Sequence, residues 1–273
     1  MEERPSMQRS DATYTLDNAW QHARERLALL EALADPGTIR HLEALGVAPG
    51  WRCWEAGAGG GSIAAWLCRR TGPAGRVVAT DLDTRFLDAL DYPNLDVRRH
   101  DIVAETPPGG AFDLIHARAL LVHLPAREAV LDRMVAALRP GGRLLLEEPD
   151  YVSKVPDPGN DPRANEVFAR VRAAEARWMA EAGIDEEYGR HMYAALLRRG
   201  LEEVSAEGRV PVARGGTPLA RFYRLTAEQS RERYLGAGLT AEDFDAYLAL
   251  HDDPDFVWTQ GTIFAAWGRK PGG

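Results

Sequence analysis

A short apolar segment, a glycine-rich loop and a helical segment follow one another from Trp51 onward, and this order recurs along the first half of the chain. Such alternation is typical of βαβ units, which build a parallel sheet with helices on its faces. We expect strands at Arg52–Glu55, Arg76–Thr80, Asp96–Arg99, Phe112–His116 and Arg143–Glu147, and helices at about Ser62–Arg70, Thr84–Leu90 and Ala126–Leu138. The sequence therefore predicts an α/β fold.

Helical patterns flank this region on both sides. Apolar residues at helical spacing predict a helix over about Asp17–Leu33, and Asp35-Pro36 predicts the start of a second helix that ends at Gly46. Beyond Asp150 we expect helices at about Pro162–Ala182, Tyr188–Arg199 and within Thr217–Leu250, and strands at about Glu203–Val212 and Val257–Trp267. The 273 residues suffice for one large α/β domain with a modest cap.

The composition narrows the classes of partner. A net charge of -8 and a pI near 5.5 would repel a phosphate backbone, so nucleic acid is not expected. Cys53 and Cys68 have apolar neighbours and no metal-like spacing, which predicts buried thiols and no metal site. No apolar run approaches bilayer length and the N-terminal residues lack a signal-peptide pattern, so we expect a cytoplasmic protein without membrane contact, as a monomer or homodimer.

The segment Glu55-Ala56-Gly57-Ala58-Gly59-Gly60-Gly61 joins the first expected strand to the first expected helix. Glycines have no Cβ, so the backbone can turn tightly and approach a flat nucleoside and an amino-acid tail at contact distance. A dinucleotide-binding fingerprint would place its third glycine at Ser62, which favours an adenosine ligand without pyrophosphate. Glu55 can then reach an ammonium group of that ligand. A tight turn between strand and helix is the structural alternative.

Acidic residues near the ends of the next two strands complete a nucleoside site. Asp81 follows the strand Val77-Val78-Ala79-Thr80, where a carboxylate can accept hydrogen bonds from both ribose hydroxyls. Leu82 can lie against the adenine, whereas Asp83 is interpreted as the N-cap of the next helix. Asp101 ends the third strand, where it can accept from the adenine amino group.

With these pieces in order, the chain resembles the class I S-adenosylmethionine-dependent methyltransferases, in particular the small-molecule methyltransferases of bacterial metabolism. The matching segments are Glu55-Ala56-Gly57-Ala58-Gly59-Gly60-Gly61, Ala79-Thr80-Asp81-Leu82-Asp83, His100-Asp101-Ile102, Phe112-Asp113-Leu114-Ile115-His116-Ala117-Arg118 with Leu121-Val122-His123-Leu124-Pro125, and Leu138-Arg139-Pro140-Gly141-Gly142-Arg143-Leu144. The resemblance covers most of the chain. It departs after the fourth strand, where His116-Ala117-Arg118 stands in place of an Asn/Asp-Pro-Pro-aromatic motif. This departure disfavours methylation of amino groups on nucleobases or glutamine.

The resemblance implies a Rossmann-like, mostly parallel sheet of seven strands whose last strand is antiparallel, with the two late strands as strands six and seven. Residues 1–50 and a helical insertion at about 215–252 would cap a core at 51–273, with the substrate above the carboxyl ends of the strands. S-adenosylmethionine is the implied cofactor, and Arg24 or Arg26 would pair with its carboxylate. The implied cofactor-binding residues are Tyr14, Arg26, Glu55, Gly57, Ala58, Gly59, Gly61, Asp81, Leu82, Asp101, Ile102, Ala117 and Arg118.

The implied activity is methyl transfer to a small-molecule substrate, for which a protein mainly aligns nucleophile, methyl group and sulfur in a dry pocket. A base helps only when the nucleophile carries a proton, and His116, His123 and Asp150 are the candidates. Tyr151 can form a wall for the substrate. We expect O-methylation ahead of N- or C-methylation. An NAD(P)-dependent oxidoreductase, which shares this strand and glycine-loop plan, and a non-catalytic S-adenosylmethionine-binding protein stay open as alternatives.

Overall fold

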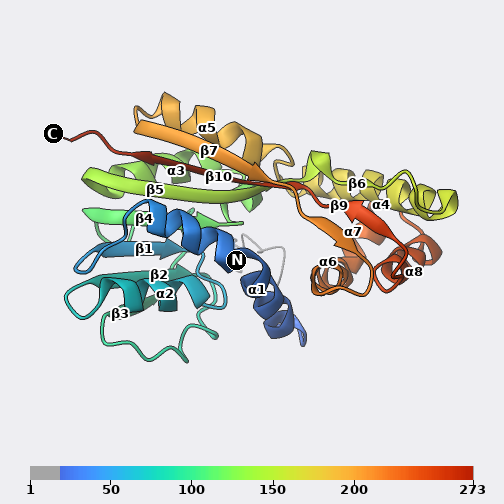
Figure 1. Cartoon of the computed structure of the whole chain (residues 1–273), viewed down its shortest axis with the longest axis horizontal. Coiled ribbons are helices and arrows are strands. Elements are labelled where there is room, and N and C mark those ends of the chain that lie inside the picture. Colours follow the sequence, from blue (N-terminus) through green and yellow to red (C-terminus); the bar gives the residue numbers. More distant parts are fainter. Residues whose placement is uncertain (1–18, 273) are drawn as a thin grey trace, which may run out of the picture.

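The computed structural model describes residues 19–272, and its core is a twisted sheet of seven strands (Figure 1). The strands lie in the order β3-β2-β1-β4-β5-β10-β7. Their bounds are β1 Arg52–Ala56, β2 Arg76–Asp81, β3 Leu95–Arg99, β4 Phe112–Arg118, β5 Leu138–Asp150, β7 Glu202–Arg209 and β10 Thr262–Arg269. Strands β1 to β5 pair in parallel, which confirms the α/β fold and the first expected strands.

The last strand of the chain, β10, runs antiparallel between β5 and β7. The two late strands therefore complete a mostly parallel, seven-stranded sheet, as the resemblance implied. The strand order reverses between β1 and β4, because the chain first extends the sheet through β2 and β3 and then returns to the other side of β1. Such a reversal opens a crevice at the carboxyl ends of the two strands, where α/β proteins bind ligands.

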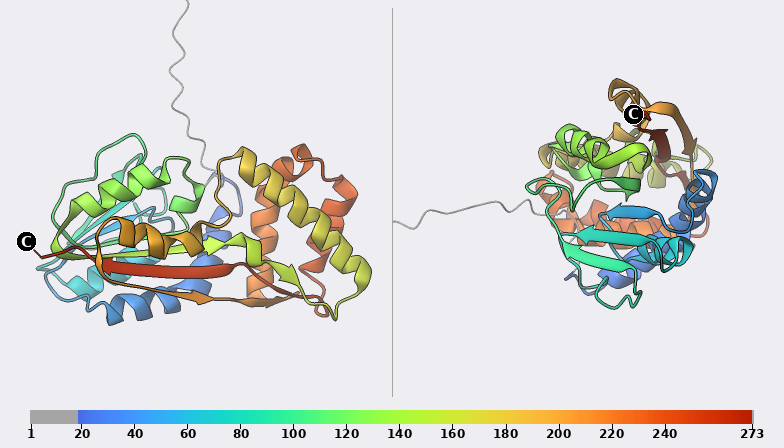
Figure 2. Two further views of the ribbon diagram at one scale, coloured as in Figure 1. Left: turned by 90° about the horizontal axis from the view of Figure 1, so that it is seen from above. Right: turned by 90° about the vertical axis from the view of Figure 1, so that its left-hand side faces the viewer.

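Helices cover both faces of the sheet, so the core has three layers (Figure 2). Successive side chains of a strand point to opposite faces. On one face Cys53 and Leu114 pack with α1 and α2, and on the other Trp54 and Ile115 pack with α3 and α5. These helices span α1 Ala23–Ala44, α2 Ser62–Thr71, α3 Arg127–Ala137 and α5 Tyr188–Arg198. Both cysteines are buried thiols, as expected.

A second group of elements extends beyond the carboxyl ends of the central strands, and we call it the cap (Figure 1). It comprises β6 Val155–Pro156, α4 Pro162–Glu181, β8 Val212–Arg214, α6 Pro218–Gln229, α7 Arg231–Gly236, α8 Ala241–Leu250 and β9 Val257–Thr259. Strands β6, β9 and β8 form a small antiparallel sheet, and α4 packs against α7 and α8. Helix α1 reaches from the main sheet to the cap, where Glu25 pairs with Arg221 of α6 at 2.9 Å.

Two expected strands are each divided between the main sheet and the small sheet. The segment Glu203–Val212 gives β7 and β8, and the segment Val257–Trp267 gives β9 and β10. Pro211 has no N–H to continue a ladder. Gly261 packs so closely against Asp150 that an added Cβ would overlap its carbonyl oxygen. The chain therefore passes between the main sheet and the small sheet at Pro211 and at Gly261.

Two helix predictions are wrong. Asp35-Pro36 does not begin a second helix, because α1 runs unbroken through the proline. The Asp35 carboxylate accepts from Arg118 of β4 at 2.9 Å instead of capping a helix, and this contact holds the proline-containing turn over the sheet. The segment Thr84–Leu90 forms turns, and its Leu87 is fully buried against the glycine loop before α2.

Candidate active site

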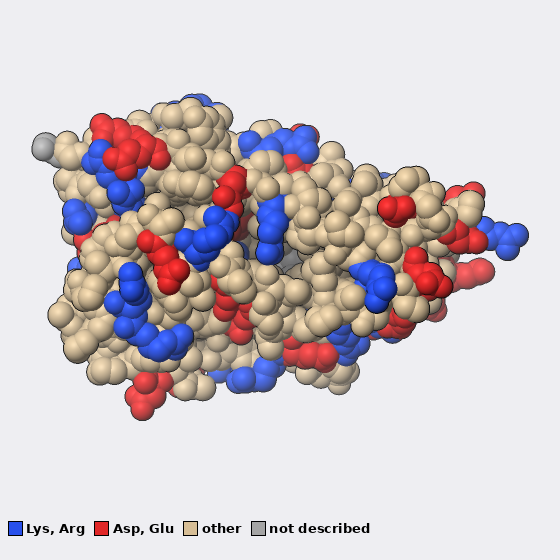
Figure 3. Space-filling model, viewed as in Figure 1, with Lys and Arg blue, Asp and Glu red and all other residues tan. Residues whose placement is uncertain are grey.

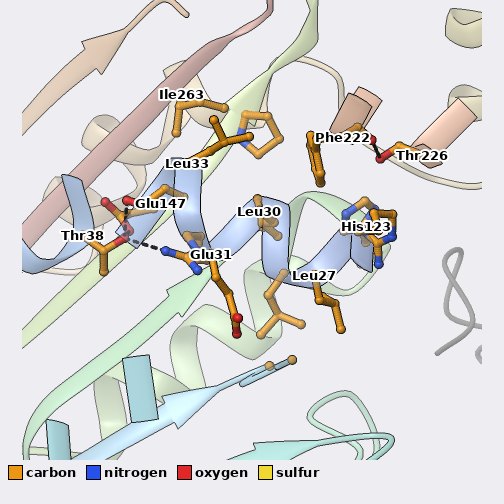
Figure 4. A pocket seen from close by; sticks show the side chains of 18 of the residues that line it. Leu27, Leu30, Glu31, Leu33, Thr38, His123, Glu147, Phe222, Thr226 and Ile263 are labelled. Carbon is orange, nitrogen blue, oxygen red and sulfur yellow. Dashed lines mark hydrogen bonds between the residues drawn. The ribbon is translucent and has the colours of Figure 1, made fainter. Parts of the chain in front are cut away.

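A cavity of about 930 Å³ lies over the carboxyl ends of β1, β2, β4 and β5, between the sheet and the cap. In Figure 4, Leu27, Leu30 and Leu33 of α1 border this cavity, and Phe222 of α6 lies across it from them. A volume near the upper end of the range for ligand pockets is enough for a nucleoside cofactor and a small substrate together.

The loop between β1 and α2 is shaped by glycines in the left-handed region. Gly57, Gly59 and Gly61 have φ angles of 70°, 55° and 90°, which side chains other than that of glycine rarely tolerate. The amide of Gly57 donates to the carbonyl oxygen of Thr80 at 2.8 Å, so the loop is held against the end of β2. Gly61 packs away from the cavity, with an added Cβ only 2.7 Å from Leu90 Cδ1. The rest of the loop, including Ala58, presents backbone to the cavity.

Asp81 ends β2 with its carboxylate beside this loop. Its Oδ2 accepts from the amide of Gly59 at 2.9 Å, and its Oδ1 accepts from the amide of Asp83 at 3.1 Å. Burial raises the pKa of Asp81, and these hydrogen bonds oppose the shift. A carboxylate offers about four lone-pair sites, so acceptor capacity is left for two ribose hydroxyls. Asp83 caps a turn by accepting from the amide of Arg85, where a helix was expected.

Leu82, Asp101 and Ile102 line the same end of the cavity. The Oδ1 atom of Asp101 accepts from two backbone N–H groups at 2.9 and 3.2 Å, which fixes the carboxyl group at the turn after β3. Its Oδ2 has no hydrogen-bond donor among the described residues and can accept from a ligand. Ala117, another expected cofactor residue, is fully buried in the sheet and does not line the cavity.

A buried histidine lies between two glutamates beneath the cavity. His116 of β4 is fully buried, with Nδ1 2.7 Å from Glu55 Oε2 and Nε2 3.3 Å from Glu147 Oε2. Burial opposes protonation, but the two carboxylates outweigh it and raise the pKa of His116 to about 9. The resulting imidazolium, with His41, holds the pKa of Glu147 well below its usual range despite burial. His116 is thus a cation that fixes Glu55 at the cavity floor.

Helix α1 extends this network across the sheet. Thr38 donates to Glu147, and His41 Nδ1 lies 3.0 Å from Glu147 Oε1 (Figure 4 shows Thr38 and Glu147). His41 Nε2 lies 2.9 Å from Glu207 Oε1 of β7. Glu147 and Glu207 both pair with Ala265 of β10 in the sheet register, and the small alanine side chain leaves room for His41 to bridge them. The helix is therefore anchored on the sheet by buried polar contacts.

Sequence reasoning missed Glu31, which lies on α1 opposite the glycine loop. Its Oε1 accepts from the amide of Ser62 at 3.2 Å, at the N-terminus of α2. Burial raises the pKa of Glu31. An added Cβ at Gly60 would overlap this carboxylate, so the glycine run makes room for Glu31 as well as for a ligand. Its helical spacing from Leu27, on the same face of α1, is the signal that places it near the site.

Glu148 is a second residue that sequence reasoning missed, and it organises the loop after β4. Its carboxylate accepts from three successive backbone N–H groups at 3.1, 2.8 and 3.3 Å. Burial raises the pKa of Glu148 to about 7. The loop contains the 3-10 helix η1 (Leu121–His123), so this buried carboxyl group determines where His123 lies.

His123 lines the cavity at the point where η1 meets the cap. It is half-buried, and burial together with the guanidinium groups of Arg26, Arg127 and Arg233 lowers its pKa to about 4. These arginines come from α1, α3 and α7. The imidazole is therefore neutral at pH 7, although its surroundings are positively charged.

The other candidate bases lie elsewhere. Asp150 is buried, pairs with Arg190 of α5 and does not line the cavity. His116 lies below the cavity floor between its two glutamates. Tyr151 does line the cavity, at the end of β5. Of the three candidate bases, His123 alone reaches the space where a substrate can bind.

Two arginines expected near the cofactor line the cavity, and Tyr14 lies outside the described residues. Arg26 is buried on α1. Arg118 donates to Thr38 at 2.9 Å and pairs with Asp35 at 2.9 Å. Helix α1 and the end of β4 thus form one connected wall of the cavity.

The cap side of the cavity is largely aromatic. Its rings are those of Trp178, Phe222, Tyr223 and Tyr234. Glu175 also lines this side, but its carboxylate pairs with the buried Lys154 at 3.1 Å and with Arg172 at 2.6 Å. The Tyr234 hydroxyl donates to the same carboxylate at 2.9 Å. The negative charge of Glu175 is therefore compensated within the protein.

Within residues 19–272 no group of His, Cys, Asp and Glu side chains is arranged to hold a metal ion. No helix in that part of the chain is long and apolar enough to cross a bilayer. Figure 3 shows basic and acidic side chains interspersed over one face of the molecule, so basic residues do not form an extended field there.

The groups at the sheet end of the cavity fit a nucleoside that carries an amino-acid tail. Open glycine backbone allows close approach, and Asp81 offers a carboxylate for ribose hydroxyls. Glu55 and Glu31 offer carboxylates for an ammonium group. A pyrophosphate at the N-terminus of α2 would instead meet the carboxylate of Glu31.

Comparisons with known proteins identify the family. Residues 13–204 match a family model described as a methyltransferase domain. The chain is 32% identical over 231 residues to methyltransferase str2 of Strobilurus tenacellus, an alignment that covers 78% of this chain and 80% of that protein. It is also 32% identical over 134 residues to a trans-aconitate 2-methyltransferase of Variovorax paradoxus, covering 48% of each.

Solved structures share the fold. Phosphoethanolamine N-methyltransferase 2 of Haemonchus contortus, in complex with phosphomonomethylethanolamine and S-adenosylhomocysteine, has a TM-score of 0.56 at 17% identity, covering 96% of this chain and 61% of that chain. The YcgJ protein of Bacillus subtilis has a TM-score of 0.52 at 14% identity, and the match covers 85% of this chain and 97% of that chain. Together with the family model, these findings show that the chain belongs to the class I S-adenosylmethionine-dependent methyltransferases.

Proposed function

We propose that this methyltransferase transfers the methyl group to an oxygen atom of a small-molecule metabolite that binds between the sheet and the cap. The observation that carries the proposal is the position of His123. Its neutral imidazole lies among three guanidinium groups, where the cofactor side of the cavity meets the aromatic cap side. A proton acceptor in a positive potential is what an oxygen nucleophile needs.

S-adenosylmethionine supplies a methyl group already activated on a sulfonium. The chain binds and orients this cofactor through carboxylates: Asp81 accepts from the ribose hydroxyls, Asp101 from the adenine amino group and Glu55 from the ammonium group. His116 holds Glu55 in place, because its imidazolium lies 2.7 Å from the Glu55 carboxylate. Orientation of this kind is the main protein contribution to a bimolecular transfer.

Helix α1 and the cap exclude water from the transfer. Leu27, Leu30 and Leu33 of α1 and Phe222 of α6 border the cavity from opposite sides (Figure 4). Because these side chains are apolar, they leave few hydrogen-bonding groups for water beside the reacting atoms. The low local dielectric also strengthens the electrostatic effect of the nearby arginines.

His123 accepts the proton of a hydroxyl nucleophile as the new bond forms. A base whose pKa is about 4 is weak, so the positive potential of the arginines around His123 must also stabilise the negative charge that develops on the oxygen. A carboxylate nucleophile would need the positive potential and no base. A protonated amine would be repelled by the same potential, which favours oxygen over nitrogen as the acceptor.

The proposal is tested with S-adenosylmethionine that carries a deuterated methyl group, incubated with the full chain and an extract of small metabolites. We expect S-adenosylhomocysteine to form together with a product whose fragmentation places the label on oxygen. Label on nitrogen or carbon contradicts the proposal. Cofactor binding without any S-adenosylhomocysteine supports the non-catalytic alternative.

A matched pair of variants tests the role of His123. We expect His123→Gln to lower kcat by about 100-fold or more, the usual contribution of general-base catalysis. His191→Gln is the control, because His191 is exposed on α5 and lies outside the cavity. An unchanged kcat in His123→Gln would remove this residue from the mechanism.

The oxidoreductase alternative is disfavoured by Glu31. A dinucleotide would place its pyrophosphate at the N-terminus of the first helix after the glycine loop. In this chain the amide of Ser62 already donates to the Glu31 carboxylate at 3.2 Å. Two negative groups would compete for the same backbone donors.

A further inference from the structure

One arginine on the cap side of the cavity, Arg233, has no anionic partner among residues 19–272. Arg40 and Arg118 line the cavity, and each pairs with a carboxylate of the chain. Arg233 of α7 also lines the cavity and is half-buried, yet no carboxylate of residues 19–272 forms an ion pair with it. Its Cζ lies 5.6 Å from the ring centroid of Trp178, so the guanidinium lies over an aromatic face. A half-buried charge of this kind favours an anionic ligand.

The surroundings of Arg233 leave that positive charge uncompensated. Arg26 of α1 and Arg127 of α3 lower the pKa of His123 together with Arg233. Three elements therefore contribute cations to the surroundings of His123. Among the described residues that line the aromatic side of the cavity, Glu175 supplies a carboxylate that is already paired with Lys154 at 3.1 Å and with Arg172 at 2.6 Å. An anion bound at Arg233 would therefore meet attraction without strong repulsion.

The shape of this side of the cavity defines the rest of the ligand. Trp178 of α4 and Phe222 and Tyr223 of α6 form its walls. Aromatic rings bind flat apolar bodies over large areas. The planar guanidinium of Arg233 can pair with one planar carboxylate through two parallel hydrogen bonds.

From this arrangement we infer that the substrate is a flat, apolar carboxylic acid whose carboxylate pairs with Arg233. The inference deepens the proposed function and rests on it, because it names the class of molecule that binds beside His123. The aromatic walls hold the body of the acid, and Arg233 selects the charged group.

The test measures binding of matched acids and amides to the full chain saturated with S-adenosylhomocysteine. The probes are benzoate, 4-hydroxybenzoate and 4-hydroxycinnamate, each beside its primary amide, together with phenyl phosphate, and binding is followed by calorimetry. We expect acids to bind about tenfold or more tightly than their amides, as a charged hydrogen-bonded pair predicts. Arg233→Gln should remove this preference. Arg231→Gln is the control, because Arg231 lies on the same helix but not on the cavity wall.

Three results would overturn the inference: acids that bind no better than amides, a preference that persists in Arg233→Gln, or tighter binding of phenyl phosphate than of benzoate. Arg233→Lys keeps the charge and loses the planar fork, so a partial preference in this variant separates charge recognition from a folding defect. Methyl transfer is measured separately. An acid that binds but is never methylated contradicts the proposed function and leaves the acid preference standing.

Discussion

Replacing His116 by glutamine tests the buried network under the cofactor side of the cavity. Glutamine fills a similar volume and can donate one hydrogen bond, but it carries no charge. In the native chain the imidazolium lies 2.7 Å from Glu55 Oε2 and 3.3 Å from Glu147 Oε2. Without it, two buried carboxylates face each other with no cation between them. Removing one partner of a buried pair costs about 3–5 kcal/mol, and we expect this loss of unfolding free energy at pH 7.

The pH dependence of stability gives an independent value for the unfolding free energy that the charge of His116 contributes. The pKa of His116 is raised from 6.5 to about 9 in the folded protein. A raised histidine pKa stabilises the fold below the unfolded pKa, and this contribution is lost as the pH rises through the folded pKa. At roughly 1.4 kcal/mol per pKa unit, the imidazolium contributes about 3.5 kcal/mol at most. Most of the difference between native chain and variant should therefore disappear between pH 7 and pH 9.5.

Urea denaturation followed by tryptophan fluorescence, at pH 7 and pH 9.5, measures this difference. Comparing the two proteins at each pH cancels the contributions of other titrating groups, such as the buried Glu148, whose pKa is about 7. His191→Gln, an exposed replacement on α5, is the control and should have no effect. A His116→Gln variant that is as stable as the native chain at pH 7, or a difference that is the same at both pH values, would refute the charged network.

Three further changes test other parts of the account. Asp81→Ala should weaken binding of S-adenosylhomocysteine by about 1–3 kcal/mol in calorimetry, because ribose hydroxyls lose a charged acceptor, and should lower the melting temperature modestly, because the amides of Gly59 and Asp83 lose theirs; unchanged affinity would contradict the assignment. Gly61→Ala should lower the melting temperature more than Gly46→Ala, since both have positive φ but only Gly61 is crowded by leucines; equal effects would contradict it. Lys154→Met should lower the unfolding free energy by less than the roughly 3–5 kcal/mol of a fully broken buried pair, because Arg172 still pairs with Glu175; adding Glu175→Gln should restore part of the loss, and the absence of any recovery would count against the pair.

Local patterns explain what the sequence predicted well. The glycine loop and Asp81 are close together along the chain, and their places beside the cavity follow from backbone freedom and from the position of an acid at the end of a strand. The alternation of strands and helices likewise follows from side-chain periodicity. The structure confirms the sheet, including its antiparallel last strand β10.

Contacts between distant parts of the chain explain the features that the sequence did not predict. Thr38 and Glu147 are 109 residues apart, and Pro36 is tolerated within α1 because contacts of this kind hold the helix on the sheet. His116 was a candidate base because it lies near a strand end. Sequence periodicity does not show that carboxylates from both neighbouring strands, Glu55 and Glu147, enclose it.

The most direct test of the central claim is a calorimetric titration of the full chain with S-adenosylhomocysteine, set beside titrations with NADH and NADPH. The account predicts saturable binding of S-adenosylhomocysteine and no binding of either dinucleotide. The reason is that open glycine backbone and Asp81 accommodate a nucleoside, while Glu31 occupies the N-terminus of α2 where a pyrophosphate would bind. Binding of NADH or NADPH without any response to S-adenosylhomocysteine would contradict it.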